Sequence, residues 1–485
     1  MDDSMFNICT KDKSDEEAQK YREIGNKYFF EKDWFYSLLN YNASILFAKS
    51  KTVASLGYGN RSAVYFETRR YKDCLLNMKW ALDNEYPEEK REKFTIRIEK
   101  CKIMMAISNP EPIDPLKVFE LSYPANEKIP WLVDCVEMRR TKVFGRGIYA
   151  TRDLKPGNVI CVEEPVFTYT NEMFKFVRCY QCVKGNAMNL IPCDQTASMM
   201  FCSTECKKKL YKEAVNLDEI SSVDVKMLSN VSAAFGSVEK FDNFIHDTDL
   251  KNLNKSIFDY DWTETNDPEY KKNLMTCLLS LSTNDHIIDN SCHIRDYVSE
   301  KAVQHLLSVF NINNKNSYYL VNSTITQGLN FGHQVSLFES LINHSCFSNV
   351  ICMNLDNKVF TIVFRAIKEG EQLFVNYDDL SKEGDEYFTD DIHLFKCKCE
   401  VHRYMKNHFV NLPSLNNAGY IMNLIKTAIV EMILNNPEKV KRSMVKIWDD
   451  LNQDTSIPNF MRYNYPHALV ALRMITFSLT YPITF

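Results

Sequence analysis

The spacing of four cysteines constrains this chain more than any other feature. Cys179 and Cys182 are separated by two residues, and Cys202 and Cys206 are separated by three. Two such pairs can place four thiolates around one tetrahedral Zn²⁺, and the stretch between the pairs has the usual length for a zinc module. The alternative is that the four side chains are free buried thiols. On the spacing of the two pairs we predict a structural zinc site.

A second cysteine group lies further along the chain. Cys397, Cys399 and His402 form a C-x-C-x2-H pattern, which supplies three ligands where a structural zinc site needs four. The chain offers three candidates for the fourth ligand, and spacing alone does not choose among them: Cys346, Cys352 and His408. Most of the other cysteines, from a total of 16, are interpreted as small buried hydrophobic residues, because disulfides are rare in a reducing compartment.

Charge and hydropathy exclude several classes of protein. The net charge is −5, so strong electrostatic binding to nucleic acid is not expected, and a DNA-binding regulator is disfavoured. No apolar run approaches the roughly 20 residues that a membrane helix needs. The first residues are acidic and lack the layout of a secretory signal, so we predict a cytoplasmic or nuclear location.

Residues 15–105 carry an internal repeat of helical character. Residues of similar size recur 37 positions apart in five pairs: Tyr28 and Tyr65, Trp34 and Tyr71, Ser37 and Cys74, Tyr41 and Met78, Ser44 and Ala81. Small residues let two antiparallel helices approach, and large residues fill the groove, so the pattern resembles the tetratricopeptide repeat. Two units and a further helix near 88–105 would form a small solenoid. A helical bundle with accidental similarity is the alternative.

β structure is expected in two separate pieces of the chain. Closely spaced prolines at 110, 112 and 115 mark a boundary after the helices. Strand patterns follow at 132–169 and return at 350–363, whereas the region between them is cysteine-rich and then helical, and helices continue beyond about 407. This arrangement suggests one β-rich domain that is interrupted by insertions.

Three further stretches now carry a family resemblance: Arg139–Ala150 with its Gly-Arg-Gly, Ser340–Asn349 with its Asn-His-Ser-Cys, and Gly370–Tyr377, which begins Gly-Glu-Gln. In this order, and followed by the C-x-C pair, they resemble SET domains, the S-adenosylmethionine-dependent protein lysine methyltransferases. The earlier cysteine insert resembles a MYND zinc finger. The chain is therefore similar to the SET-and-MYND methyltransferases, as a divergent, insect-type member of the branch with N-terminal tetratricopeptide repeats.

The resemblance implies an α+β multidomain fold with a β-rich SET core. The implied order is tetratricopeptide-like repeats at 1–105, the N-terminal part of the SET domain at 106–175, a MYND-type zinc finger at 176–216, a helical insert at 217–320, the C-terminal SET core at 321–380, a post-SET zinc site at 381–406 and a C-terminal helical region at 407–485.

The resemblance also implies roles for individual residues. The cofactor-binding positions would be Gly145, Arg146, Gly147, Asn322, Ser340, Asn343, His344, Tyr377 and Phe395. The phenol of Tyr377 would also be catalytic, by aligning the lysine amine with the sulfonium of S-adenosylmethionine. The amine must be neutral, and a narrow apolar channel favours that form although its free pKa is about 10.4.

Two structural zinc sites are implied in the same way, and neither takes part in the chemistry. The first has the ligands Cys179, Cys182, Cys202 and Cys206, and the second has Cys346, Cys397, Cys399 and His402. A MYND finger usually holds a further zinc, but here only Cys193 remains of that site. Thr196, Ala214 and Asp218 occupy the other positions, so we predict two zinc ions per chain.

Departures in the lysine channel open an alternative function. His393 and Thr324 stand where aromatic residues are expected, and Ser348 replaces a proline. A wider or hydrated channel would desolvate the amine less. We therefore predict an active protein-lysine N-methyltransferase with histone or non-histone substrates, and keep as the alternative a weak or inactive scaffold. Such a scaffold would recruit a peptide tail or chaperone through its repeats. We expect a monomer with no membrane or strong nucleic-acid binding.

Overall fold

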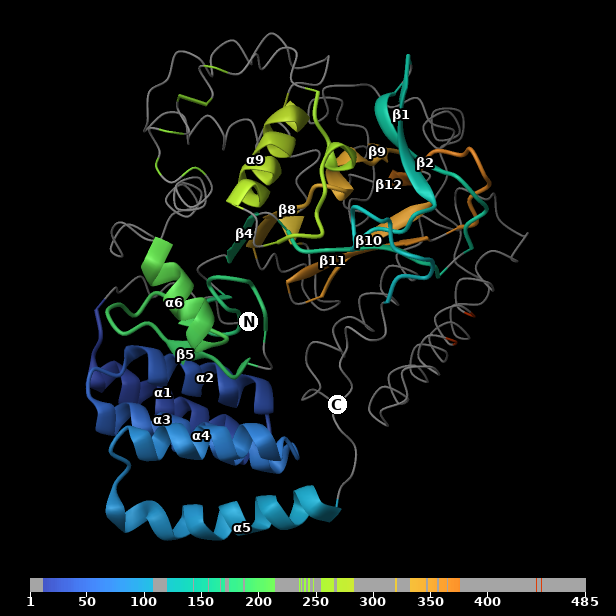
Figure 1. Cartoon of the computed structure of the whole chain (residues 1–485). Helices are drawn as coiled ribbons and strands as arrows, with labels where there is room; N and C mark the ends of the chain where they lie inside the picture. The colour runs from blue at the N-terminus through green and yellow to red at the C-terminus, as the bar shows by residue number, and fades with distance from the viewer. Residues whose placement is uncertain are drawn as a thin grey trace, which may run out of the picture. The chain divides into compact units, whose positions relative to one another are not determined.

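The computed structural model describes about half of the chain (Figure 1). The described residues are 12–107, 120–213 apart from 143, 156, 166, 171–173 and 186–187, then 254–265, 268–282, 319–320, 332–345, 348–355, 357–363 and 365–375, with isolated positions between 235 and 247 and at 442 and 446. The chain divides into two compact units. Unit 1 comprises 1–112, 169–221 and 478–485, and unit 2 comprises 113–168 and 222–477.

Unit 1 begins with five α-helices and one turn of 3-10 helix: α1 (Asp15–Phe30), α2 (Trp34–Phe47), α3 (Lys51–Glu67), α4 (Tyr71–Asp83), η2 (Glu88–Lys90) and α5 (Arg91–Ile107). Side chains define where the first three begin, because Ser14, Asp33 and Ser50 each accept a hydrogen bond from a backbone N–H in the first turn of the helix that follows. The predicted helical N-terminal region is confirmed.

The 37-residue repeat corresponds to two helix pairs, α1 with α2 and α3 with α4. Lys32 and Arg69, which are 37 residues apart, both have φ of 61° in the turns that follow α1 and α3. Within the packed pairs the predicted small positions, such as Ser37 and Cys74, are fully buried. A Cβ added at Gly25 would lie 2.6 Å from the Tyr41 ring, so that position must stay small. The assignment to the tetratricopeptide class stays a prediction.

The rest of unit 1 is the cysteine-rich module. It contains the short strands β5 (Ile191–Pro192) and β6 (Met200–Phe201), which pair antiparallel, and helix α6 (Thr204–Glu213). The hairpin is extended by a backbone hydrogen bond from Cys193 to Met199, 2.9 Å long. These pairings bring the two cysteine pairs to one end of the module.

Polar side chains of the helices bind the main chain of this module. Asn42 Nδ2 donates to the carbonyls of Phe176 and Met188, at 2.7 and 2.8 Å. Arg61, which is fully buried, donates from Nη1 to the carbonyl of Leu190 at 2.7 Å. Its Nη1 also donates to Asn42 Oδ1 at 2.6 Å. The helices therefore hold residues 176–190 through main-chain groups.

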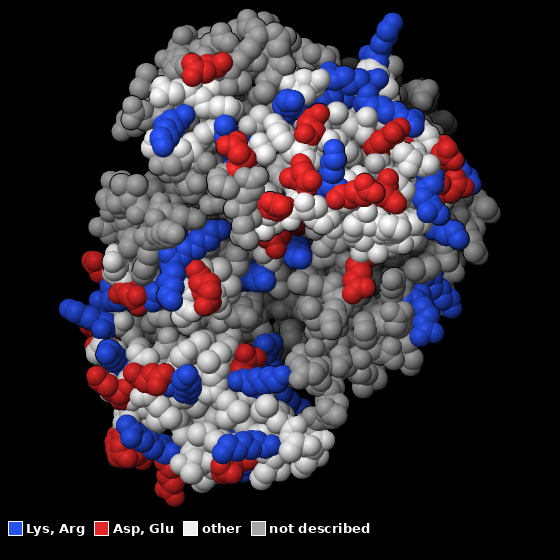
Figure 2. All heavy atoms as spheres, in the orientation of Figure 1, with Lys and Arg blue, Asp and Glu red and all other residues white. Residues whose placement is uncertain are grey.

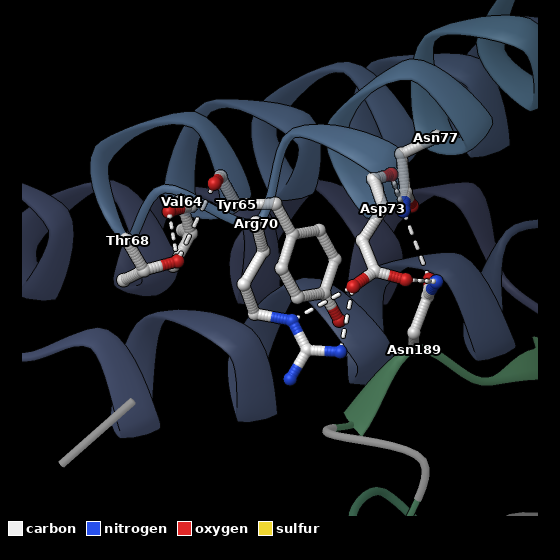
Figure 3. Close-up of polar contacts among 7 residues, drawn as sticks. All are labelled: Val64, Tyr65, Thr68, Arg70, Asp73, Asn77 and Asn189. Carbon is white, nitrogen blue, oxygen red and sulfur yellow. Dashed lines mark hydrogen bonds and ion pairs between the residues drawn. The ribbon is translucent and has the colours of Figure 1, made fainter. Parts of the chain in front are cut away.

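Helix α4 adds a second row of contacts to the same segment (Figure 3). Asn77 accepts from Arg61 Nε at 2.6 Å and donates to Asn189 Oδ1 at 2.8 Å. The amide of Asn189 in turn donates to Asp73 at 2.8 Å, and Asp73 forms an ion pair with Arg70 at 2.6 Å. Helices and cysteine-rich module thus share one connected hydrogen-bond network.

Unit 2 is rich in β structure. Its strands are β1 (Val136–Thr141), β2 (Gly145–Ala150), β3 (Val159–Glu163), β7 (Tyr319–Leu320), β8 (Gly332–Val335), β9 (Asn343–His344), β10 (Val350–Leu355), β11 (Lys358–Val363) and β12 (Phe374–Val375), and β4 (Phe167–Thr170) lies at the boundary between the units. β1 and β2 form one antiparallel pair, and β10, β11 and β3 form an antiparallel sheet, so both predicted β pieces contribute to one core.

The region between the β pieces contains helices among its described residues, but it also contains the short strands β5 to β9. Helix α9 spans Pro268–Ser282, and η6 spans Ile257–Asp259. Trp262 is 1% exposed, and its indole N–H donates to the carbonyl of Ile257 at 2.7 Å. The short 3-10 helix η8 (Glu339–Leu341) lies between β8 and β9. The predicted helices beyond residue 407 lie outside the described residues.

Two further features of the described residues are the hydropathy of their helices and the distribution of their charges. Searched over these residues, the chain has no helix with the length and apolar character required to span a bilayer. Basic and acidic side chains are interspersed on the face shown in Figure 2.

Candidate functional site

The four cysteines of the first group converge in the structure. The sulfur atoms of Cys179, Cys182, Cys202 and Cys206 all lie within 4.8 Å of one another. Cys182 and Cys202 are 3.5 Å apart, and Cys202 and Cys206 are 3.6 Å apart. Four thiolates about 2.3 Å from one tetrahedral zinc would be separated by about 3.8 Å. The donor set and its spacing therefore fit a structural zinc ion.

Protonation of these thiols reflects their crowding. Burial, as the largest cause, raises the pKa of Cys179, whereas hydrogen bonds from the other sulfurs, first that of Cys179, lower the pKa of Cys206. A cluster that favours a thiolate at one position and thiols at its neighbours is stabilised by a cation, because a metal ion lets all four ligands deprotonate.

Of the four positions that would hold the further zinc of a MYND finger, the structure describes two, Cys193 and Thr196. Cys193 is fully buried, and Thr196, at a position where a cysteine is expected, exchanges a hydrogen bond with Ser198 at 2.7 Å. Ala214 and Asp218 lie outside the described residues. Among the residues that are described, only the first group gathers three or more metal-ligating side chains.

The predicted cofactor loop comprises the connection between β1 and β2 in unit 2 and the residues Gly145, Arg146 and Gly147, which are the first three residues of β2. Gly145 has φ of +64°, in the left-handed region that favours glycine. Gly147 must be glycine for a different reason, because an added Cβ would lie 2.3 Å from Gln372 Nε2 and 3.0 Å from Asn343 Nδ2. The main chain of this loop is therefore in close contact with side chains from the Asn-His-Ser-Cys and Gly-Glu-Gln stretches.

Asn343 fastens the loop to strand β9. Its Nδ2 donates to the carbonyl of Arg146 at 2.6 Å and to that of Phe144 at 3.2 Å. The strand itself pairs in parallel with β12, placing Asn343 opposite Phe374 and His344 opposite Val375. The Phe144 and Phe374 rings are in edge-to-face contact with centroids 5.3 Å apart. Three stretches that are distant in sequence thus meet at one place.

Two residues that the sequence analysis gave no role complete this junction. Gln372 is 8% exposed, and its Oε1 accepts a hydrogen bond from the Tyr149 hydroxyl at 2.8 Å. Asn349 donates to the carbonyl of Gln372 at 2.8 Å and accepts from the N–H of Phe374 at 2.7 Å. Their position inside the two quoted motifs is the only signal in the sequence that marks them.

Arg146 and Ser340 turn their side chains inward. The Arg146 guanidinium is 5% exposed and donates from Nη2 to the carbonyl of Ser280 in α9, at 2.9 Å. The Ser340 hydroxyl donates to the carbonyl of Ser336. At both positions the side chain fixes the backbone, so main-chain groups are what the site can present.

The remaining predicted site residues lie outside the described part of the chain. These are Asn322, Cys346, Tyr377, Phe395, Cys397, Cys399 and His402, together with the channel residues Thr324 and His393. Their roles stay predictions. Tyr377 is placed only by sequence, as the second residue after strand β12.

Comparison with known proteins defines the class of the domain at this junction. The family model for the SET domain matches residues 145–378, just under half of the chain. This range contains Gly147, Asn343 and Gln372, the residues whose contacts join the three stretches. Unit 2 therefore holds a SET domain, and the chain as a whole combines that β-rich core with a helical N-terminal region.

Curated relatives carry the names of SET-domain and methyltransferase proteins. Protein-lysine N-methyltransferase SMYD4 of Danio rerio is 24% identical over 41% of this chain and 29% of its own length. The Homo sapiens protein of that name is 22% identical over 40% of this chain and 32% of its own length. A SET domain-containing protein of Dictyostelium discoideum is 21% identical over 68% of this chain and 95% of its own length.

The chain contains a SET domain and resembles the SET-and-MYND proteins, as its sequence predicted. The match spans about a third of the length of the SMYD4 proteins. Among solved structures, the SET domain of LSMT bound to lysine and AdoHcy is 11% identical, covering 72% of this chain and 86% of its own, with a TM-score of 0.19. A TM-score this low supports no argument about this chain.

Proposed function

We propose that this chain is an S-adenosylmethionine-dependent protein-lysine N-methyltransferase that acts on histone or non-histone proteins. The observation that carries the proposal is the junction of Gly147, Asn343 and Gln372. A loop whose backbone is held by the side-chain amide of Asn343, with no Cβ of its own at Gly147, can present main-chain groups to a small polar ligand. The SET domain match and the methyltransferase names of the relatives support the same activity.

The cofactor would supply an electrophilic methyl group next to this loop. The chain's own residues then have two tasks, which are to fix the loop and to present a neutral lysine amine in line with that methyl. Asn343 performs the first through the carbonyls of Phe144 and Arg146. Strand β12, held by β9, leads directly to Tyr377, which we propose as the residue that orients the amine.

Methyl transfer tests the proposal directly. The full-length protein is incubated with labelled S-adenosylmethionine and a panel of proteins that includes histones, and Tyr377→Phe serves as the comparison. We expect label in a lysine of at least one protein, and a loss of rate of at least about tenfold in the variant. A rate that the substitution leaves unchanged would contradict the role given to Tyr377. Absence of transfer by a protein that binds the cofactor would favour the scaffold.

The scaffold alternative rests on polar groups along α1, α3 and α5 in unit 1. Asn26 Oδ1 accepts from the Tyr41 hydroxyl at 2.9 Å and from Asn60 at 2.7 Å. Arg97 donates to Ser62 at 2.8 Å. Nε of Arg22 has no hydrogen-bond partner among the described residues. Two cations and two amides here suit an anionic group such as a peptide carboxylate.

Burial raises the pKa of Tyr86, and the charges of Arg97 and Arg22 both act on that pKa in the opposite direction. Titration of a fluorescent acidic peptide with a free C-terminus would test this function. We expect binding that Arg97→Ala weakens and that amidation of the peptide weakens equally. Binding insensitive to both changes would reject the site. A peptide-tail or chaperone partner, a monomeric state and a cytoplasmic or nuclear location remain parts of the proposal.

Both zinc sites are proposed as structural. The first is supported by the geometry of its four sulfurs. The second, with Cys346, Cys397, Cys399 and His402, rests on the resemblance alone. Substitution of His402 with measurement of bound zinc and of the melting temperature would test it, since an unchanged value of both would reject His402 as a ligand.

A further inference from the structure

Glu163 is a buried acid that binds the main chain of a distant segment. It is the last residue of β3 and is 2% exposed. Its Oε2 accepts hydrogen bonds from the N–H groups of Leu337 and Phe338, at 2.9 and 3.2 Å, and its Oε1 accepts from the N–H of Glu339 at 3.2 Å. Three consecutive N–H groups that converge on one carboxylate form an anion-binding turn, and here the anion is a side chain of the same unit.

The bound turn leads directly into the part of the chain to which cofactor contacts are assigned. Glu339 begins η8, Ser340 is the next residue, and Asn343 and His344 form β9. At its far end the segment is fixed by Asn343, which donates to the carbonyls of Phe144 and Arg146. The carboxylate of Glu163 fixes the near end. The segment is therefore fastened at both ends, once to β3 and once to the glycine loop.

The groups around Glu163 leave it as the acid that titrates near neutral pH. Burial raises its pKa from the ordinary 4.5 to about 7, against the effect of the three N–H donors. Burial and the proximity of Glu163 raise the pKa of Glu339 well above its ordinary value. Burial, as the largest cause, also raises the pKa of the Cys161 and Cys352 thiols, which therefore stay protonated. A protonated carboxyl oxygen offers these N–H groups a poorer acceptor than a carboxylate does.

We propose that Glu163 is a positioning residue for cofactor binding, whose ionised carboxylate holds the 337–339 turn so that Ser340 and Asn343 are presented in the geometry that the methyl donor needs. This inference rests on the proposed methyltransferase function. It assigns Glu163 no contact with the cofactor. Its effect is transmitted through the backbone of the turn.

Calorimetric titration of the full-length protein with S-adenosylhomocysteine tests the proposal. Glu163→Gln preserves the size of the side chain but replaces one acceptor oxygen with an NH₂ group that faces N–H donors. We expect its dissociation constant to rise by about tenfold or more, since a charge-assisted contact is lost. Asp15→Asn is the matched control, because Asp15 also accepts two main-chain N–H groups, those of Lys49 and Ser50, but does so in unit 1. The affinity of Asp15→Asn for S-adenosylhomocysteine should stay within about twofold of the wild-type value.

The pH dependence separates positioning from general destabilisation, and its first measurement, on the wild-type protein, needs no variant. The affinity of the wild-type protein should fall by several-fold between pH 8 and pH 6, as Glu163 gains a proton, and Asp15→Asn should show the same slope. In Glu163→Gln the slope should be lost. A flat wild-type profile, or equal affinities of the Gln variant and the wild type, overturns the inference while cofactor binding stands. A wild-type protein that does not bind S-adenosylhomocysteine overturns the proposed function as well.

Discussion

The network between the helices and the cysteine-rich module makes a quantitative prediction for Asn77→Ala. Asn77 is fully buried and is the acceptor for Arg61 Nε, at 2.6 Å, and the donor to Asn189, at 2.8 Å. Removal of its amide leaves a buried guanidinium with a second nitrogen unpaired, because Arg61 Nη2 already has no partner among the described residues. Loss of a hydrogen bond to a charged group costs about 1.5–3 kcal/mol, and loss of the hydrogen bond that Asn77 donates to Asn189 Oδ1 adds about 1 kcal/mol.

The expected loss of stability for Asn77→Ala is therefore about 2.5–4 kcal/mol, which corresponds to a fall of roughly 10 °C in the melting temperature of a unit of this size. Asn84→Ala is the matched control, since Asn84 ends the same helix and makes one side-chain bond, to the carbonyl of Trp80 at 2.8 Å. It should cost about 1 kcal/mol.

Two signals should be followed in the same melt, which are helix content by circular dichroism and zinc release by a chromogenic chelator. If one network holds helices and module together, the two transitions should coincide and shift together in Asn77→Ala. A variant that melts within about 2 °C of the wild type would refute the reasoning about Arg61. Zinc released at the wild-type temperature, after the helices have already melted, would refute the coupling.

Three further predictions concern the sites themselves. Gly147→Ala should destabilise the protein by about 1–3 kcal/mol and weaken binding of S-adenosylhomocysteine, because the added Cβ would lie 2.3 Å from Gln372 Nε2. The double variant Gly147→Ala, Gln372→Ala should regain part of the lost melting temperature, and no regain would contradict the steric cause. Atomic absorption should find two zinc ions per chain, and one in Cys202→Ser, whereas three or more in the wild type would contradict the assignment. The pKa of Glu163 is raised from 4.5 to about 7, so the folded state holds this proton more tightly than the unfolded chain; the stabilisation is complete below pH 4.5 and lost as the pH rises through 7, by about 3 kcal/mol in denaturant titrations. A Glu163→Gln variant with an unchanged pH dependence would rule that out.

Features encoded within a short stretch of sequence were predictable. The two cysteine pairs converge because Cys182 lies in a local turn, Cys202 and Cys206 lie where β6 leads into α6, and the pairing of β5 with β6 brings these segments together. The helix pairs were predictable for a similar reason, since small and large residues at a fixed offset act between neighbouring helices. The boundaries at Ser14, Asp33 and Ser50 follow from capping chemistry that acts over three residues.

Features that depend on a partner far along the chain were not predictable. Arg61 is an ordinary polar residue of a helix in the sequence, but it is fully buried because the carbonyl of Leu190 and the amides of Asn42 and Asn77 surround its guanidinium. Gly147 belongs to a motif too short to be specific. A side chain at position 147 would collide with the amide of Gln372, and no local sequence pattern connects these two residues.

The two buried acids of the SET core show how position decides charge. Glu163 and Glu339 are 2% and 1% exposed, and after burial itself the charge of Glu163 raises the pKa of Glu339, because like charges in a site without water cannot both be stabilised. The N–H groups of residues 337–339 point toward Glu163, whereas Oε2 of Glu339 has no hydrogen-bond partner among the described residues. The single negative charge therefore resides on Glu163, at the start of the segment that leads to Asn343. A glutamine at 339 would leave that charge in place, so Glu339→Gln should keep the pH slope of cofactor affinity that Glu163→Gln removes.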